Sequence, residues 1–251
     1  MKSLPKRQQA QVEGHALSYT MSGSGRPTLV LINGAGGPIE GWFRLYPAIE
    51  QLGTVLAYDR PGVGASGPPR VPQTGRAVVG LLRGLLERIG ATPPYVLVAH
   101  SFGGLHAQLF ARLHPDEVAG VVFLEATAPQ DVGSIKQHQG AGLRVLHAVL
   151  GRFARRHPFD EVAHEVTTVQ ELATAPAFPQ VPVCVVSGAK RPPSFLFPPE
   201  AARLRQQHQQ GLASLSSKGQ QVIATSSGHF PQMSQPELVL RVIAEVAAAA
   251  R

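Results

Sequence analysis

The chain has 251 residues, of which 43% are hydrophobic and 16% are charged, so it can bury a core large enough for one α/β domain. Its 26 glycines and 22 prolines are spread along the sequence, which indicates many tight turns and excludes a low-complexity tail. The formal net charge of +7 comes from scattered basic residues without interleaved aromatics, so we expect no nucleic-acid partner.

The sequence shows neither a membrane-spanning segment nor a secretory signal. No stretch of about 18 apolar residues occurs, and the first 14 residues are not followed by the apolar run of about 7–15 residues that a signal peptide needs. The single Cys184 cannot form an internal disulfide, and we interpret it as a small buried hydrophobe. We therefore expect a cytoplasmic protein without a membrane span.

Strands and helices are predicted to alternate along most of the chain. A leading hairpin is expected within residues 8–22, about Gly14 and His15. After it, apolar runs predict strands at 28–34, 54–59, 95–99, 119–125, 181–187 and 220–225. Helical spacing predicts helices at about 40–51, 76–90, 102–113, 199–216 and 236–249. Because alternating strands and helices require crossover connections, we predict a mostly parallel eight-stranded sheet with helices on both faces.

One long interval interrupts this alternation. About 55 residues separate the strands at 119–125 and 181–187, where an α/β connection usually needs about 2–6. Such an insertion usually lies over a site, and we interpret residues 130–178 as a cap insertion within a single domain, 1–251. Its first part is basic and its second part is acidic; the charged residues are Lys136, Arg144, Arg152, Arg155, Arg156, Asp160, Glu161, Glu165 and Glu171. The two parts can pair with each other on a solvated helical face, or the basic part can attract an anionic substrate.

Residues 95–104, YVLVAHSFGG, place a serine where a strand turns abruptly into a helix. Such a turn presents Ser101 as a nucleophile, and Ala99 stands where the G-x-S-x-G pattern has its first glycine. A serine hydroxyl is a weak nucleophile, so it needs a base in hydrogen-bond reach and a third group that orients the base. The alternative is a serine that caps a helix, but the apolar strand before it and Gly103 and Gly104 after it favour the nucleophile.

Among the ten histidines, His229 is the candidate base. It lies on a loop after the last predicted strand, and it follows Ser101 in the chain order serine, acid, histidine. His100 and His106 flank the serine in sequence. We expect the first to point away across the turn and the second to face along the helix, so neither is chosen.

Four segments together resemble the α/β-hydrolase fold family, and the resemblance covers nearly the whole chain. LVLINGAGG at 29–37 is similar to the family's oxyanion loop, and YDRPGVGAS at 58–66 to its arginine-proline-glycine loop. AHSFGG at 99–104 is similar to its nucleophile elbow, and SGHFPQMSQPE at 227–237 to its histidine loop. The resemblance implies an α/β-hydrolase fold with a short helical cap.

The same resemblance implies an oxyanion hole made of backbone amides. Ala35 and Phe102 are the expected donors, with Gly36 as the donor if the loop register differs by one residue. Asn33 replaces the family's usual histidine, and we expect its side chain to brace the loop.

The acid is where the sequence departs from the family's commonest pattern. After the strand VPVCVVSG the chain offers Lys190 and Arg191 instead of an aspartate. A minority of the family takes the acid one strand earlier, and here that position is Glu125, at the end of the strand 119–125. This edge of the sheet also carries Ser101, which favours Glu125, although an acid is common there without being catalytic. The alternatives are Glu200 and, in poorer places, Asp116, Glu117 and Asp131.

No cofactor is expected. Residues 62–67, GVGASG, match a dinucleotide fingerprint, but Pro61 precedes them and Pro68 and Pro69 follow, so no helix can open there to hold a pyrophosphate. No H-E-x-x-H motif and no cysteine pair indicates a metal site.

The resemblance and the residues predict a serine esterase that acts through an acyl-enzyme on a small carboxylic ester. An elbow aspartate would have indicated a dehalogenase or an epoxide hydrolase, and position 101 is a serine. A lactonase, an amidase, a thioesterase or a carbon–carbon bond hydrolase would use the same triad, and a weakly catalytic small-molecule receptor of the same fold remains an alternative. Trp42, Phe230 and Met233 are candidate substrate-binding residues. The natural substrate and the oligomeric state stay open.

Overall fold

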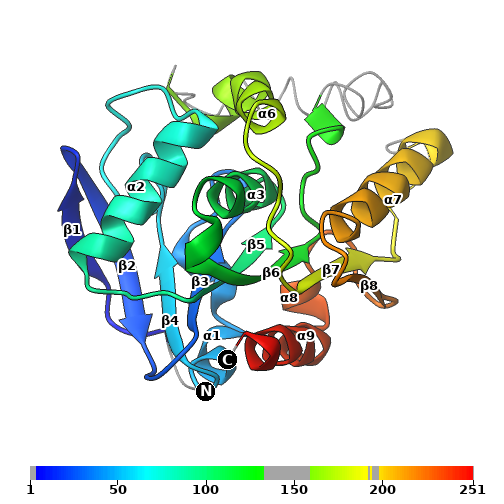
Figure 1. Ribbon diagram of the computed structural model, residues 1–251, viewed down its shortest axis with the longest axis horizontal. Helices are drawn as coiled ribbons and strands as arrows, with labels where there is room; N and C mark the ends of the chain where they lie inside the picture. Colours follow the sequence, from blue (N-terminus) through cyan, green and yellow to red (C-terminus); the bar gives the residue numbers. More distant parts are fainter. Residues whose placement is uncertain (1–3, 133–158, 192, 194–197, 251) are drawn as a thin grey trace.

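An eight-stranded sheet forms the centre of the computed structural model, which describes residues 4–132, 159–191, 193 and 198–250. The strand order is β1-β2-β4-β3-β5-β6-β7-β8 (Figure 1). The first two pairings, β1 with β2 and β2 with β4, are antiparallel, and the remaining pairings are parallel. The prediction of a mostly parallel eight-stranded sheet with a leading hairpin is confirmed.

The strands and helices have the following bounds. The strands are β1 (Gln8–Val12), β2 (His15–Ser22), β3 (Thr28–Ile32), β4 (Thr54–Tyr58), β5 (Tyr95–His100), β6 (Val118–Leu124), β7 (Val183–Gly188) and β8 (Gly219–Ala224). The longer helices are α2 (Gly75–Arg88), α3 (Gly103–Leu113), α6 (Glu165–Ala173), α7 (Pro199–Ala213) and α9 (Pro236–Ala249). Short helical turns are η1 (Ile39–Trp42), α1 (Tyr46–Ile49), η2 (Pro115–Glu117), η3 (Glu161–His164) and α8 (Pro231–Ser234).

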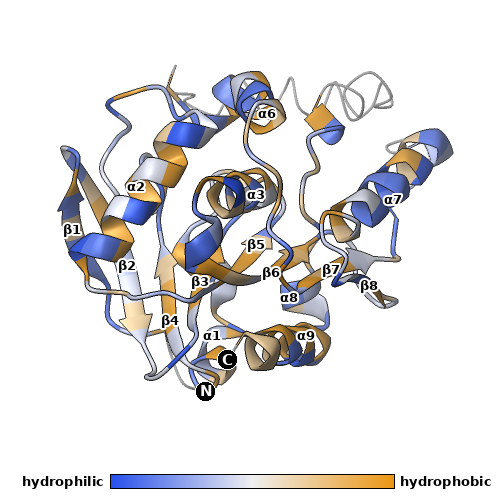
Figure 2. Ribbon diagram, in the orientation of Figure 1, coloured by the Kyte–Doolittle hydropathy of each residue, from blue (hydrophilic) through white to orange (hydrophobic). Residues whose placement is uncertain are grey.

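The core lies in two layers, one on each face of the sheet. Helices α2, α3 and α7 contribute to the first layer, and α1 and α9 contribute to the second (Figure 1). In β5, Leu97 packs into the first layer and its neighbour Val98 into the second, because successive side chains of a strand point to opposite faces. The central strands are therefore buried on both faces and read as continuous apolar runs, as their colouring in Figure 2 shows.

Cys184 is one of the residues buried in the central strands. It lies in β7 with no exposed surface, and burial raises the pKa of its thiol to about 12. The interpretation of Cys184 as a buried small hydrophobe is confirmed. Its thiol stays protonated near neutral pH and is correspondingly inert.

The helix predicted at 40–51 was wrong as a continuous element. The structure has two short turns instead, η1 and α1, separated by residues 43–45. Pro47 lies in the first turn of α1. A proline has no backbone N–H, so it is tolerated at the start of a helix but removes a hydrogen bond inside one.

The interval interpreted as a cap insertion is described only in part. Its basic residues, Lys136, Arg144, Arg152, Arg155 and Arg156, lie outside the described residues. At its far end η3 leads into α6, which packs against α2 and α3 (Figure 1). Two acidic residues of this end contact the body of the domain: Glu161 pairs with Arg60, and Glu171 accepts a hydrogen bond from the amide of Arg76.

Among the residues that the structure describes, no helix combines the length and the hydropathy needed to cross a bilayer.

Candidate active site

Ser101 lies on the turn between β5 and α3 in a left-handed backbone conformation, with φ of +51°. Its amide donates to the carbonyl of Leu124 at 3.1 Å, and its own carbonyl accepts from Gly104 at 2.9 Å and from Thr127 at 2.8 Å. Left-handed backbone is uncommon for residues other than glycine, so these bonds hold a strained turn. The N-cap residue of α3 is Phe102, and no side chain makes a capping bond there, so the structure does not support Ser101 as an ordinary helix cap.

Two glycines allow the turn to fit against the oxyanion loop, which we define as residues 33–37. A Cβ added at Gly103 would lie 2.6 Å from the carbonyl oxygens of Ile32 and Asn33. A Cβ added at Gly34 would lie 3.0 Å from the Cβ of Ser101. Small residues are therefore required here because the start of α3 and the oxyanion loop touch each other.

His229 lies beside Ser101 although 128 residues separate them. Its Nε2 is 2.9 Å from the Ser101 Oγ, a hydrogen-bond distance, and its Nδ1 is 3.6 Å from Oε2 of Glu125. The second distance is longer than a formed hydrogen bond but still places the carboxylate beside the ring. The His229 side chain is 46% exposed, so it faces the surface from which a substrate can approach.

Glu125 directly follows β6, also with left-handed backbone, at φ of +44°. One carboxylate oxygen accepts from the amide of Gly188 at 2.7 Å, and the other is 3.3 Å from Nη2 of Arg205. Burial alone would raise the pKa of Glu125, but neighbouring His229, Arg205 and the Gly188 amide hold it below its usual value. Glu125 is therefore an ionised carboxylate that faces the second nitrogen of the His229 ring.

The alternative acids lie elsewhere. Asp131 accepts hydrogen bonds from Arg205 at 2.7 Å and is 2.6 Å from Nδ1 of His208. Asp116 and Glu117 belong to η2, which precedes β6 and so lies at the opposite edge of the sheet. Glu200 is exposed in the first turn of α7.

Arg205 was not found from the sequence, although it holds Glu125 in place. Its guanidinium donates to the backbone carbonyl of Glu125 at 2.7 Å as well as to the carboxylates of Glu125 and Asp131. Arg205 comes from α7, 80 residues after Glu125, and periodicity gives no sign of such a pairing.

The oxyanion loop is braced from inside and from outside. The Asn33 side chain donates to the carbonyl of Pro38 at 2.7 Å, which confirms the prediction that it braces the loop. The amide of Gly36 donates to Oε1 of Glu161 at 3.1 Å. Because this bond already occupies Gly36, the geometry favours Ala35 over Gly36 as the loop's donor to a substrate.

A second pair that sequence reasoning missed lies behind this loop. Arg60 Nε is 2.6 Å from Oε2 of Glu161, and both side chains are buried. The Arg60 guanidinium also donates to the carbonyl of Asn33 at 2.8 Å and to that of Gly34 at 2.5 Å. Burial opposes both charges, yet the pKa of Arg60 is raised and that of Glu161 is lowered because each stabilises the other. The only sequence signal was the position of Arg60 in the motif YDRPGVGAS.

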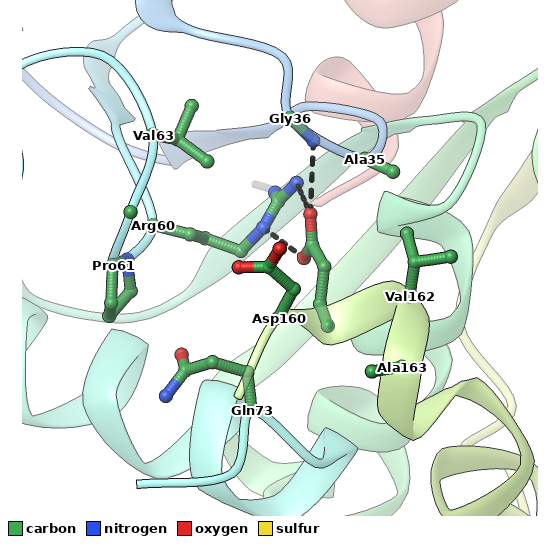
Figure 3. A pocket seen from close by; sticks show the side chains of 11 residues that line it. Ala35, Gly36, Arg60, Pro61, Val63, Gln73, Asp160, Val162 and Ala163 are labelled. Atoms are coloured by element: carbon green, nitrogen blue, oxygen red, sulfur yellow. Dashed lines mark hydrogen bonds and ion pairs between the residues drawn. The ribbon is translucent and has the colours of Figure 1, made fainter. Parts of the chain in front are cut away.

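A pocket of about 370 Å³ opens next to the oxyanion loop, with Ala35 and Gly36 on one side (Figure 3). Its apolar walls are Pro61, Val63, Val162 and Ala163. In Figure 3 the Arg60 side chain extends across the pocket toward Gly36. The pocket shares Ala35 and Gly36 with the oxyanion loop, whereas Ser101, Glu125 and His229 are not among its lining residues.

The three candidate substrate-binding residues have different places. Phe230 is 55% exposed, and its ring centre is 5.1 Å from that of His229. Met233 is half-buried in α8, where its carbonyl accepts from Arg44 at 2.7 Å. Trp42 has no exposed surface and packs in the core layer of α1 and α9, so the structure does not bring it together with Ser101; a large apolar ring gains most from full burial.

His100 and His106 are both buried. His100 does contact the site, because its Nε2 is 2.8 Å from the carbonyl oxygen of His229. His106 packs edge-on against Phe102, with ring centres 5.3 Å apart. Burial lowers the pKa of each histidine to about 4, so both are neutral near pH 7.

Two further sequence motifs can be placed. The glycine-rich residues 62–67 form a loop closed by a hydrogen bond from Gly62 to Gly67 at 2.8 Å, and the next helix begins only at Gly75. Within the described residues, no group of three or more His, Cys, Asp or Glu is arranged to hold a metal ion.

The chain belongs to the alpha/beta hydrolase family, whose model matches residues 29–242. The protein YqjL of Bacillus subtilis is 34% identical over 103 residues, which are 41% of each chain. Epoxide hydrolase B of Mycobacterium tuberculosis is 36% identical over 111 residues, 43% of this chain and 31% of that protein. The chain thus spans less than half the length of these curated relatives.

Among solved structures, an esterase from Thermogutta terrifontis has the same fold. It aligns with a TM-score of 0.67 over 98% of this chain and 99% of its own, at 22% identity. This likeness shows that the two chains share their fold over nearly their whole length.

Proposed function

We propose that the protein is a serine hydrolase that cleaves a small carboxylic ester through an acyl-enzyme. The observation that carries the proposal is the 2.9 Å contact between Ser101 Oγ and His229 Nε2, on a strained turn and with the ionised Glu125 behind the imidazole. A nucleophile, a base and an orienting acid in this order are the parts that acyl transfer requires.

In the first half of the reaction, His229 Nε2 removes the proton of Ser101 as Oγ attacks the ester carbonyl carbon. The carbonyl oxygen takes up the negative charge and accepts hydrogen bonds from the amides of Ala35 and Phe102. The tetrahedral intermediate then collapses, the carbon–oxygen bond to the alcohol breaks, and protonated His229 gives its proton to the leaving oxygen. Glu125 stays ionised throughout and stabilises the imidazolium.

Water completes the cycle in the second half. His229 removes a proton from a water molecule, whose oxygen attacks the acyl carbon bound to Ser101. The second tetrahedral intermediate collapses when His229 returns the proton to Ser101 Oγ, and the carboxylic acid leaves.

The pocket supports a small substrate. A volume of about 370 Å³ is near the lower end for small-molecule sites, and its apolar walls suit a short hydrocarbon part of an ester. Because η3 contributes Val162 and Ala163 to these walls, we interpret residues 130–178 as a cap insertion of a single domain, 1–251.

The choice of ester chemistry rests on the elbow residue. Epoxide opening in this fold would need a carboxylate at the elbow, and Ser101 favours acyl transfer instead. The name of the Thermogutta terrifontis relative, an esterase, agrees with this choice.

The test is turnover of a short-chain chromogenic ester together with covalent labelling by a serine-directed fluorophosphonate. Ser101→Ala is expected to abolish labelling and to lower turnover by about 10⁴-fold or more, with an unchanged circular dichroism spectrum. Ser214→Ala is the matched control, because this exposed serine lies at the end of α7, where its hydroxyl bonds to the Gln210 carbonyl at 3.1 Å. Folded wild-type protein that neither turns over the ester nor takes the label would instead favour a small-molecule receptor.

A further inference from the structure

We propose that Arg60 and Glu161 are positioning residues of the oxyanion hole, which fix the oxyanion loop in the conformation that stabilises the transition state. The inference rests on the proposed function, and it concerns residues to which the triad gives no role. It follows from the way these two side chains contact the loop.

The pair bonds to the backbone of the oxyanion loop at three residues, two before Ala35 and one after it. Arg60 donates to the carbonyls of Asn33 and Gly34, at 2.8 and 2.5 Å. Glu161 accepts from the amide of Gly36 at 3.1 Å. Ala35 lies between these anchors, so the peptide units on both sides of the proposed donor are fixed by one ion pair.

The side chains of Arg60 and Glu161 also hold each other in place. Arg60 Nε and Nη2 are 2.6 and 2.9 Å from the two oxygens of Glu161, a bidentate geometry in which both side chains are held rigidly. The side chains are 2% and 9% exposed, so solvent does not compete for these bonds. A buried bidentate pair restricts the loop more than an exposed one would.

Charge balance at this place matters for the oxyanion. An unpaired carboxylate next to Gly36 would repel the negative charge that develops on the substrate oxygen, and Arg60 cancels it. Burial lowers the pKa of the nearby His106 to about 4 and raises that of Tyr58 to about 12, so both are neutral near pH 7, whereas the acidic side chain of Asp160 also lines this pocket. The pair therefore orients the loop without adding net charge to the site.

Glu161 belongs to η3, in the segment interpreted as the cap insertion, whereas Arg60 follows β4. Glu161, a residue of the insertion, thus bonds both to Arg60 and to the backbone of the oxyanion loop. This contact links the part of the protein that shapes the pocket with the part that stabilises the transition state.

The test compares the double variant R60M/E161L with wild type. Replacing both members of a buried pair by apolar residues is often neutral for stability, whereas removing one leaves a buried charge. We expect a folded protein whose kcat falls by about 10²-fold, the scale of one lost oxyanion donor, with KM changed by less than about twofold. The turnover is expressed per Ser101 titrated with the fluorophosphonate, so a smaller folded fraction does not lower it.

Two further variants complete the test. R83M/E117L removes the more exposed pair between α2 and η2, whose charged groups are 3.0 Å apart, and is expected to keep wild-type kcat. R60K keeps the charge, but its single ammonium cannot reach two carbonyls and a carboxylate, so we expect a kcat reduction of about tenfold. If R60M/E161L does not fold, the kcat of R60K tests the positioning role instead.

The outcomes separate the two proposals. The positioning role is overturned if R60M/E161L keeps turnover per titrated Ser101 within about twofold of wild type. If the double variant does not fold, the same result in R60K overturns it. In both cases the proposed esterase activity stands. Absence of turnover and labelling in the wild type would instead overturn the proposed function itself.

Discussion

Replacing Glu125 by glutamine tests the acid with the least change of shape. In the wild type one carboxylate oxygen accepts from the Gly188 amide, and the other faces Arg205 and His229. A glutamine that keeps the first bond turns its NH₂ group toward the His229 ring and toward Arg205. The variant therefore loses the charge and places a donor where the imidazole needs an acceptor.

The size of the loss follows from the distance between the carboxylate and the imidazole. Two unit charges 3.6 Å apart interact by 332/(20 × 3.6), or about 4.6 kcal/mol, with the effective dielectric constant of about 20 used near protein surfaces. The imidazole is 46% exposed, so solvent screening reduces this to about 3–4 kcal/mol. At 1.36 kcal/mol per tenfold change in rate, Glu125→Gln should lower kcat by about 10²–10³-fold.

The assay is hydrolysis of the short-chain chromogenic ester at pH 7–8, with turnover expressed per titrated Ser101. The matched control is Glu200→Gln, because Glu200 is the next acid that the sequence offers and is exposed on α7. We expect the control to keep wild-type kcat and Glu125→Gln to keep the wild-type KM. Near-wild-type kcat in Glu125→Gln, or a large loss in Glu200→Gln, would refute the assignment of the acid.

Three other substitutions test the surroundings of the site. Gly34→Ala places a Cβ 3.0 Å from that of Ser101, so the nucleophile must shift; we expect kcat for the chromogenic ester to fall by about 10²-fold, and unchanged kcat would contradict the close fit. Arg205→Met leaves the buried carboxylates of Glu125 and Asp131 without their cation, so the free energy of unfolding should fall by about 3–5 kcal/mol. Thermal unfolding should show Tm lowered by about 6–20 °C, and a shift of less than about 2 °C would count against this role. His106→Leu should make the protein less sensitive to acid. Burial lowers the pKa of His106 from 6.5 to about 4 in the folded protein, so between pH 6.5 and pH 4 a proton binds to this histidine only in the unfolded chain and favours unfolding. Between about pH 6.5 and pH 4 the free energy of unfolding should therefore fall by up to 2.5 × 1.36, or about 3 kcal/mol, more in the wild type than in the variant. Urea unfolding at pH 7 and pH 4 measures both losses, and equal losses would refute the prediction.

Much of the fold could be predicted because its signals are local. Continuous apolar runs such as 95–100 mark strands buried on both faces, and a serine between such a run and a glycine pair marks the turn. The proximity of Ser101, Glu125 and His229 could also be predicted. Each follows a parallel strand, and the carboxyl ends of parallel strands share one edge of the sheet.

The features that the sequence did not reveal depend on distant pairings. Arg60 and Glu161 are 101 residues apart, and Arg205 lies 80 residues after Glu125. Their contacts depend on the paths of the insertion and of α7, which hydrophobic periodicity does not specify. Trp42 illustrates the same limit, since its position in the chain near the oxyanion loop did not show which face of the sheet its ring would cover.

The left-handed backbone at Ser101 and Glu125 has a consequence for protein engineering. A residue with a side chain gives up about 1–2 kcal/mol in this conformation relative to glycine. Glycine at position 101, where the side chain makes no bond among the described residues that holds the fold together, should therefore yield a more heat-resistant but inactive protein. A directed-evolution campaign that selects for thermostability alone would favour such variants, so selection must retain a requirement for turnover.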